Sequence, residues 1–76
     1  MDAPEGREFE SIRERLGERI RELRVSSGLS QEALSDLAEC PPTYVSMIDR
    51  KLWNPSLKML TQIAASLGTK IDDLLR

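Results

Sequence analysis

Hydrophobic residues recur three or four positions apart along most of this chain, a spacing that predicts α-helices. The first predicted helix runs from Glu8 to Val25, and charged residues flank its apolar stripe of Phe9, Ile12, Leu16, Ile20 and Leu23. Gly28 suits the left-handed residue that follows a helix end. We expect residues 1–7 to form a frayed polar segment and residues 8–76 to form one domain.

The stretch from Leu29 to Ser56 predicts two short helices joined by a tight corner. Ser30 can cap the first helix, whose buried face is expected to be Ala33, Leu34, Leu37 and Ala38. The run Glu39-Cys40-Pro41-Pro42 ends that helix, because a proline disfavours helical backbone in the residue before it. Pro42 can open the second helix, since a first-turn residue needs no amide hydrogen.

In the second short helix, Val45 and Ile48 lie three residues apart and are expected to dock on the first. The helix is expected to end near Asp49-Arg50. Ser56 then caps a helix that Gly68 ends, with a predicted core stripe of Leu57, Leu60, Ile63, Ala64 and Leu67. A last short helix carries Ile71, Leu74 and Leu75. The pattern therefore predicts an all-α fold, a compact five-helix bundle.

Composition excludes several classes of function. The chain has 76 residues, one cysteine and no histidine, so we expect no internal disulfide, no metal site and no cofactor. Nothing in the sequence resembles a catalytic constellation, and we do not expect an enzyme or a small-molecule substrate. The longest apolar run is too short to cross a membrane, and a reducing, cytoplasmic location is expected.

The charge is distributed unevenly. The formal net charge is −2, which argues mildly against nucleic acid as a partner. When the chain is divided into residues 1–24, 25–40, 41–60 and 61–76, only residues 41–60 are net positive, with Arg50, Lys51 and Lys58 against Asp49 alone. The excess is small, so one copy is expected to bind nucleic acid weakly.

Five strings in order, LGERIRELR, GLSQEAL, YVSMIDR, NPSLKMLTQIAASLG and IDDLL, resemble the Cro and lambda-repressor-type (XRE-like) helix-turn-helix transcription regulators. The resemblance extends from about Leu16 to Leu75. It implies a lambda-repressor-like DNA-binding domain in which the second short helix enters the major groove of double-stranded DNA.

The resemblance, together with the outward positions of that helix, predicts two sets of contacts. Bases are expected to be contacted by Pro42, Thr43, Ser46 and Met47. Phosphates are expected to be contacted by Gln31, Arg50, Lys51, Asn54 and Ser56. The family also often pairs a basic residue at the end of its first helix with an acid ending the reading helix. Here the pair is Arg24 and Asp49, expected to be loose and partly exposed because aspartate is short.

Three departures from the family pattern are visible. Glu39 stands where the corner usually has glycine, so a bulky residue must accept a left-handed or altered turn. Pro41 replaces the usual Ser or Thr cap of the reading helix. Leu52-Trp53 replaces basic or polar residues, and forms either a contact surface or a lid on the core.

The sequence predicts a sequence-specific regulator, a repressor or autoregulator, that binds a palindromic operator as a symmetric homodimer. The predicted dimer surface is Trp53, Ile71, Leu74 and Leu75. Phe9 and Ile12 either fold onto the domain's own core or meet a partner subunit. The alternative function is a protein-interaction module on the same fold, such as an antitoxin or adaptor, that reads DNA weakly or not at all.

Overall fold

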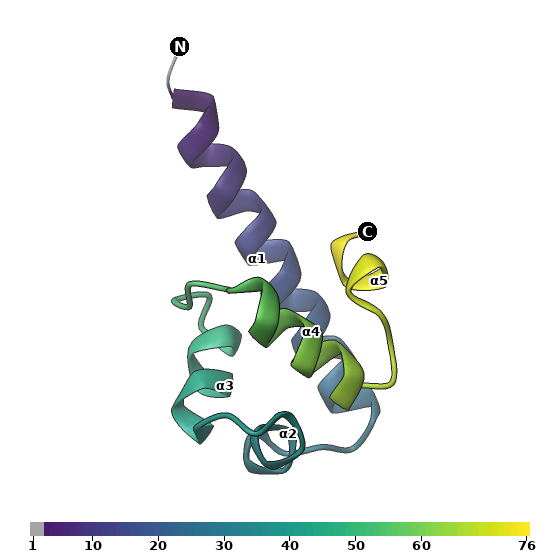
Figure 1. Ribbon diagram of the computed structural model, residues 1–76. Helices are drawn as coiled ribbons and strands as arrows, with labels where there is room; N and C mark the ends of the chain where they lie inside the picture. The colour runs from purple at the N-terminus through teal and green to yellow at the C-terminus, as the bar shows by residue number, and fades with distance from the viewer. Residues whose placement is uncertain (1–2) are drawn as a thin grey trace.

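The computed structural model describes the backbone of residues 3–76 and the side chains of residues 8–76. This part of the chain forms helices only, which confirms the all-α five-helix prediction (Figure 1). The helices are α1 (Ala3–Ser26), α2 (Gln31–Ala38), α3 (Pro42–Asp49), α4 (Leu57–Ser66) and α5 (Ile71–Leu75). None of the described helices is long and apolar enough to cross a membrane.

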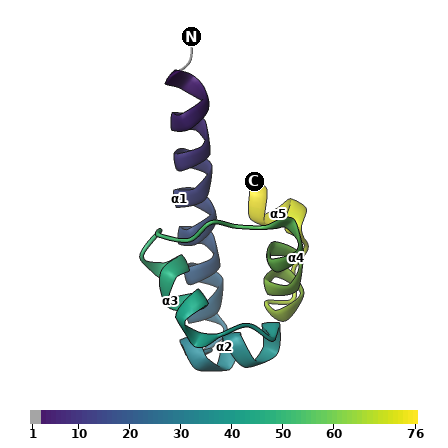
Figure 2. The same cartoon turned by 60° about the vertical axis from the view of Figure 1, so that its left-hand side comes forward.

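Helix α1 is the longest element, and its first half projects from the bundle (Figures 1 and 2). Its start at Ala3 shows that the predicted start at Glu8 was wrong. The fraying expected for residues 1–7 stays a prediction, and residues 1–2 lie outside the described residues. Phe9 is 45% exposed and Ile12 is 41% exposed, so the alternative in which they fold onto the domain's own core is wrong.

The core lies between the second half of α1 and the four shorter helices. Each helix contributes to one cluster of buried side chains, as the hydrophobic spacing predicts. Its buried members are Leu16, Ile20, Leu34, Ala38, Val45, Ile48, Trp53, Leu60, Ile63, Ala64 and Leu74. Helix α3, which is the predicted reading helix, is therefore held by packing on both α1 and α2.

Two leucines predicted to lie in the core are on the surface. Leu37 is 57% exposed and Leu57 is 73% exposed. On α2 the buried arc is Leu34, Ser35 and Ala38, and Leu37 lies outside it because the neighbouring helices cover a narrower arc than the apolar residues span. Leu57 opens α4, before the turn that reaches the core.

Two residues predicted to form the dimer surface belong to the core instead. Trp53 is 0% exposed and Leu74 is 3% exposed. The Trp53 ring meets Tyr44 edge to face, with ring centroids 6.0 Å apart, and Leu74 belongs to the same apolar cluster as Leu16. Both assignments to the dimer surface were wrong. Trp53 instead fills the interior, whereas its neighbour Leu52 is 62% exposed.

The predicted caps and helix ends are confirmed. The Ser30 hydroxyl accepts a hydrogen bond from the Ala33 N–H at 3.0 Å, and the Ser56 hydroxyl accepts one from the Met59 N–H at 3.2 Å. Gly28 has φ 74° and follows α1, while Gly68 has φ 72° and follows α4. Local side-chain chemistry therefore determines where these helices begin and end.

Candidate DNA-binding interface

The corner between α2 and α3 is formed without glycine. Glu39 adopts left-handed backbone angles, φ 57° and ψ 48°, as its position in the corner predicts. The Cys40 N–H donates to the Ser35 carbonyl at 2.9 Å and closes the turn. Pro41 then precedes α3 without a side-chain cap, and Pro42 is the first helical residue. The chain thus turns sharply and starts the next helix at once.

Helix α3 presents one face to the core and another to solvent. Val45 and Ile48 are both 0% exposed and hold the helix on the bundle, as predicted. Pro42 and Thr43 are exposed at its start, and Arg50 is exposed directly after its end. The predicted base-reading set is therefore open at its N-terminal end, where reading helices of this type contact base edges.

The other two predicted base-reading residues are less accessible. Ser46 and Met47 are half-buried, and Met47 packs partly against the core. A thioether that lies partly under neighbouring side chains offers only part of its surface to a thymine methyl. Thr43 is consequently the more accessible of the two predicted hydroxyl contacts on α3.

The five predicted phosphate contacts lie around α3, and three of them already have protein partners. Gln31 is half-buried and its amide donates to Asp49 Oδ2 at 2.7 Å. Lys51 has φ 59° and its Nζ lies 2.9 Å from Glu18 Oε1. The Ser56 hydroxyl is occupied as the α4 cap. Arg50 and Asn54 are exposed.

The predicted Arg24–Asp49 pair is present, but the expectation that it would be loose and partly exposed was wrong. Arg24 Nη2 lies 2.9 Å from Asp49 Oδ2, and each side chain is only 11% exposed. Arg24 also donates to the Leu29 carbonyl at 2.8 Å. Because Gln31 uses the same carboxylate oxygen, one buried network joins α1, α2 and the end of α3. The sequence carried no signal for the Gln31 contact.

Gly17 is a positioning residue that the sequence pattern alone did not reveal. A Cβ placed there would lie 2.9 Å from the Ile48 carbonyl oxygen, so the missing side chain allows the end of α3 to approach α1. Glycine inside a helix costs about 0.5–1 kcal/mol relative to alanine. A glycine within an otherwise strong helical pattern was the one available signal of close packing.

Burial and charge alter three ionisable groups around the interface. A hydrogen bond and the positive charge from Lys51 lower the pKa of Glu18. Burial raises the pKa of the Cys40 thiol, which favours the unreactive protonated form. Burial, followed by the influence of Cys40, raises the pKa of Tyr44. Tyr44 lies on α3 itself, Cys40 lies in the corner before α3, and Glu18 lies on α1.

Sequence and structure comparisons place these observations in a family. The profile described as "Helix-turn-helix" matches residues 20–74. Control protein C.SmaI of Serratia marcescens is 36% identical over 67 residues, covering 88% of this chain and 80% of the relative. A hypothetical transcription factor of Neisseria meningitidis is 38% identical over 66 residues, or 87% of this chain, which spans 62% of that relative's length.

Two crystal structures have the same arrangement. The Neisseria transcription factor superposes with a TM-score of 0.81 at 38% identity, over 86% of this chain and 75% of the other. The restriction-modification controller protein C.AhdI of Aeromonas hydrophila gives a TM-score of 0.76 at 37% identity, over 79% of this chain and 91% of the other. The chain therefore belongs to the XRE-type helix-turn-helix family of DNA-binding transcription regulators.

Proposed function

We propose that this chain is a repressor or autoregulator that reads a palindromic operator as a symmetric homodimer, with α3 in the major groove. The observation that carries the proposal is the position of α3. Its inner face is fully buried through Val45 and Ile48, whereas Pro42 and Thr43 at its start and Arg50 after its end are exposed. A helix held in this way has the width needed to enter the major groove.

In this proposal Thr43 and Ser46 donate to or accept from base edges, while Pro42 and Met47 make apolar contacts. Hydroxyl groups bond to more than one base, so the readout of each half-site is modest. Arg50 and Asn54 contact the backbone directly. Gln31, Lys51 and Ser56 reach phosphates only by sharing or exchanging their present protein partners. Because each of these side chains must give up part of a protein contact to bind a phosphate, each phosphate contact adds less to the affinity for DNA.

We propose a dimer because one copy is expected to bind DNA weakly. A dimer doubles both the base contacts and the cationic rim, and its half-sites would lie about 34 Å apart, one helical turn of DNA. Ile71 and Leu75 remain the predicted contacts on α5. The relatives named control proteins and transcriptional regulators support transcription control as the physiological class.

Selection of bound duplexes from a random pool tests the proposal. We expect recovery of a palindromic sequence, and weaker binding as salt rises from about 50 to about 200 mM because counterions are released on binding. The Arg50→Gln variant should weaken binding to all duplexes and reduce the salt slope by about 2 per dimer. Arg21→Gln, an exposed change on α1, is the control. If no sequence is enriched at low salt with micromolar protein, the proposal is wrong.

A protein-interaction module is the second candidate, and the 62% exposed Leu52 beside α3 favours it. An exposed leucine on this loop suits a protein partner better than a phosphate backbone. The variants Arg50→Glu and Leu52→Asp separate the two functions. Loss of duplex binding with Arg50→Glu alone supports the regulator, whereas loss of a protein partner with Leu52→Asp alone supports the module.

A further inference from the structure

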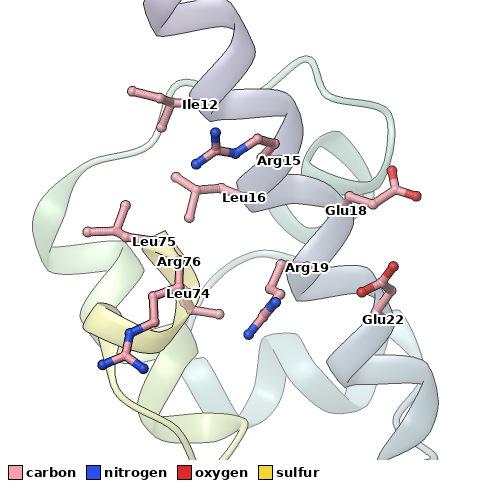
Figure 3. Close-up of a pocket in the computed structure, with 9 residues that line it drawn as sticks. All are labelled: Ile12, Arg15, Leu16, Glu18, Arg19, Glu22, Leu74, Leu75 and Arg76. Carbon is pink, nitrogen blue, oxygen red and sulfur yellow. The ribbon is translucent and has the colours of Figure 1, made fainter.

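The projecting half of α1 carries apolar side chains that the chain covers only in part, since Arg13 lies over the Phe9 ring at 5.4 Å from its centroid. Phe9 and Ile12 are 45% and 41% exposed, although they continue the stripe that is buried at Leu16 and Ile20. Leu75, at the end of α5, is 48% exposed. Ile12 and Leu75 line the same groove, which measures about 240 Å³ (Figure 3). Ile12 and Leu75 therefore belong to one surface that spans α1 and α5, and Phe9 lies three residues before Ile12 on the same stripe of α1.

We infer that this surface, called here the α1 arm and defined by Glu8, Phe9, Ile12, Arg15 and Leu75, pairs with the same surface of a second copy. The two α1 helices would run antiparallel, with the two-fold axis passing between Phe9 and Ile12. The inference rests on the proposed homodimer and names its contact surface. It also replaces the two predicted contacts, Trp53 and Leu74, that the structure places in the core.

Charge complementarity favours a second copy as the occupant. Glu8 and Arg15 lie seven residues apart on one edge of the apolar stripe, because seven residues make almost two helical turns. In the antiparallel arrangement Glu8 of each copy faces Arg15 of the other, so opposite charges meet twice across the axis.

The position of α3 on α1 is compatible with this pairing. Gly17 and Arg24 mark the side of α1 that faces α3, since one meets Ile48 and the other binds Asp49. At 3.6 residues per turn, this side lies roughly 90° around α1 from the stripe of Phe9 and Ile12. A two-fold axis perpendicular to paired α1 helices therefore leaves both reading helices on the same side of the dimer.

The length of α1 also gives a suitable separation. The α3 contacts on α1 are centred about ten residues beyond the crossing point, and each residue of helix rises about 1.5 Å. The two reading helices would then be roughly 30 Å apart along α1, close to the ~34 Å between successive major grooves on one side of DNA. A pair of α5 helices alone would contribute little apolar area, since only Ile71 and Leu75 are accessible there.

Dimerisation measured by analytical ultracentrifugation tests the inference on the full chain. Phe9→Glu with Ile12→Glu is expected to raise the dimer dissociation constant about 100-fold, from the loss of two buried apolar side chains in each copy. Leu37→Glu with Leu57→Glu is the matched control, because those leucines are more exposed but lie away from the arm. An unchanged dimer in the arm variant would overturn the inference.

Charge reversal provides the second measurement. Glu8→Arg and Arg15→Glu should each weaken the dimer about tenfold, and the double variant should restore it. Within one copy these positions are separated by about 10 Å of helix, so rescue identifies a contact between copies. Failure of rescue, or capture of another protein by the arm while this chain stays monomeric, would also overturn the inference.

Duplex binding separates this inference from the proposed function. A wild-type chain that dimerises through the arm but enriches no DNA sequence would support the arm and remove the operator proposal. If the chain binds an operator as a dimer and the arm variants do not affect that dimer, the inference about the α1 arm is wrong and the operator proposal is unaffected.

Discussion

Arg24 and Gln31 bind the same oxygen of Asp49, Arg24 at 2.9 Å and Gln31 at 2.7 Å. The network holds the last residue of α3 to both preceding helices, and its two charges are almost removed from water. Leaving one such charge without its partner costs about 3–5 kcal/mol, although replacing both by apolar residues is often close to neutral. The pair is therefore expected to position the reading helix more than to increase stability.

Asp49→Ala is expected to destabilise the chain by about 3 kcal/mol because it leaves the Arg24 guanidinium buried without its carboxylate. The double variant Arg24→Met, Asp49→Leu should recover most of that loss. Urea denaturation of the two variants measures both effects. Equal stability of Asp49→Ala and the wild type would show that the pair is solvated in solution.

Gly17→Ala is expected to move α3, since the added Cβ would meet the Ile48 carbonyl oxygen at 2.9 Å. Overpacking costs about 1–3 kcal/mol, and the gain in helix propensity returns up to about 1 kcal/mol. We expect a net loss of stability of about 1 kcal/mol and weaker duplex binding. Ser11→Ala, an exposed change on α1, should raise the denaturation midpoint slightly through helix propensity and leave the duplex affinity unchanged.

Glu18 is expected to titrate below its ordinary range, because Lys51 lowers its pKa. A lowered pKa in the folded state means that the ion pair persists as the pH falls below the usual carboxyl range and is lost on passing the lowered value. Lys51→Ala should return the Glu18 pKa toward normal in a carboxyl NMR titration. A Glu18 titration that does not respond to Lys51→Ala would exclude the contact.

The same ion pair is expected to limit duplex binding. Glu18→Gln should release Lys51 toward a phosphate and strengthen binding about twofold to threefold at low salt, in line with the small free energy of surface pairs. Glu22→Gln removes the same charge one turn further along α1 and is the control. Equal effects of the two variants would indicate a general charge effect.

Glu39→Gly is expected to stabilise the chain, because Glu39 adopts a left-handed conformation that costs an L-residue about 1–2 kcal/mol. The added freedom of glycine in the unfolded chain removes part of this gain, so we expect about 1 kcal/mol. Glu32→Gly inside α2 should have the opposite sign. Thermal denaturation of both variants gives the comparison, and destabilisation by Glu39→Gly would contradict it.

The sequence predicted the helices well where local chemistry determines them. Ser30 and Ser56 cap helices with their own hydroxyls, and Pro42 can only occupy a first turn, so these boundaries do not depend on tertiary contacts. Periodicity also identified Val45 and Ile48 as the inner face of α3. Such features are encoded by neighbours within four residues and can be recognised without a structure.

The errors concern residues whose surroundings are determined by distant elements. Trp53 lies in a loop without periodicity, and only the three-dimensional position of that loop places the ring in the core. Leu37 and Leu57 satisfy helical spacing, but no helix covers them. The phosphate contact of Gln31 stays a prediction, but its bond to Asp49 was not foreseen because it depends on how α2 meets α3. Packing partners of this kind have no signature in local sequence.

One uninterrupted helix carries both Phe9 and Gly17. The geometry of α1 therefore determines the distance and the rotation between the α1 arm and the reading helix α3. Inserting a single alanine between these two positions would turn the arm by about 100° relative to α3. The two copies could then pair without facing a common duplex. Inserting seven residues would nearly restore the orientation and lengthen the reach of each copy by about 10 Å. The number of α1 residues between the arm and α3 would then determine, as much as the side chains do, which operator spacing a dimer can bind.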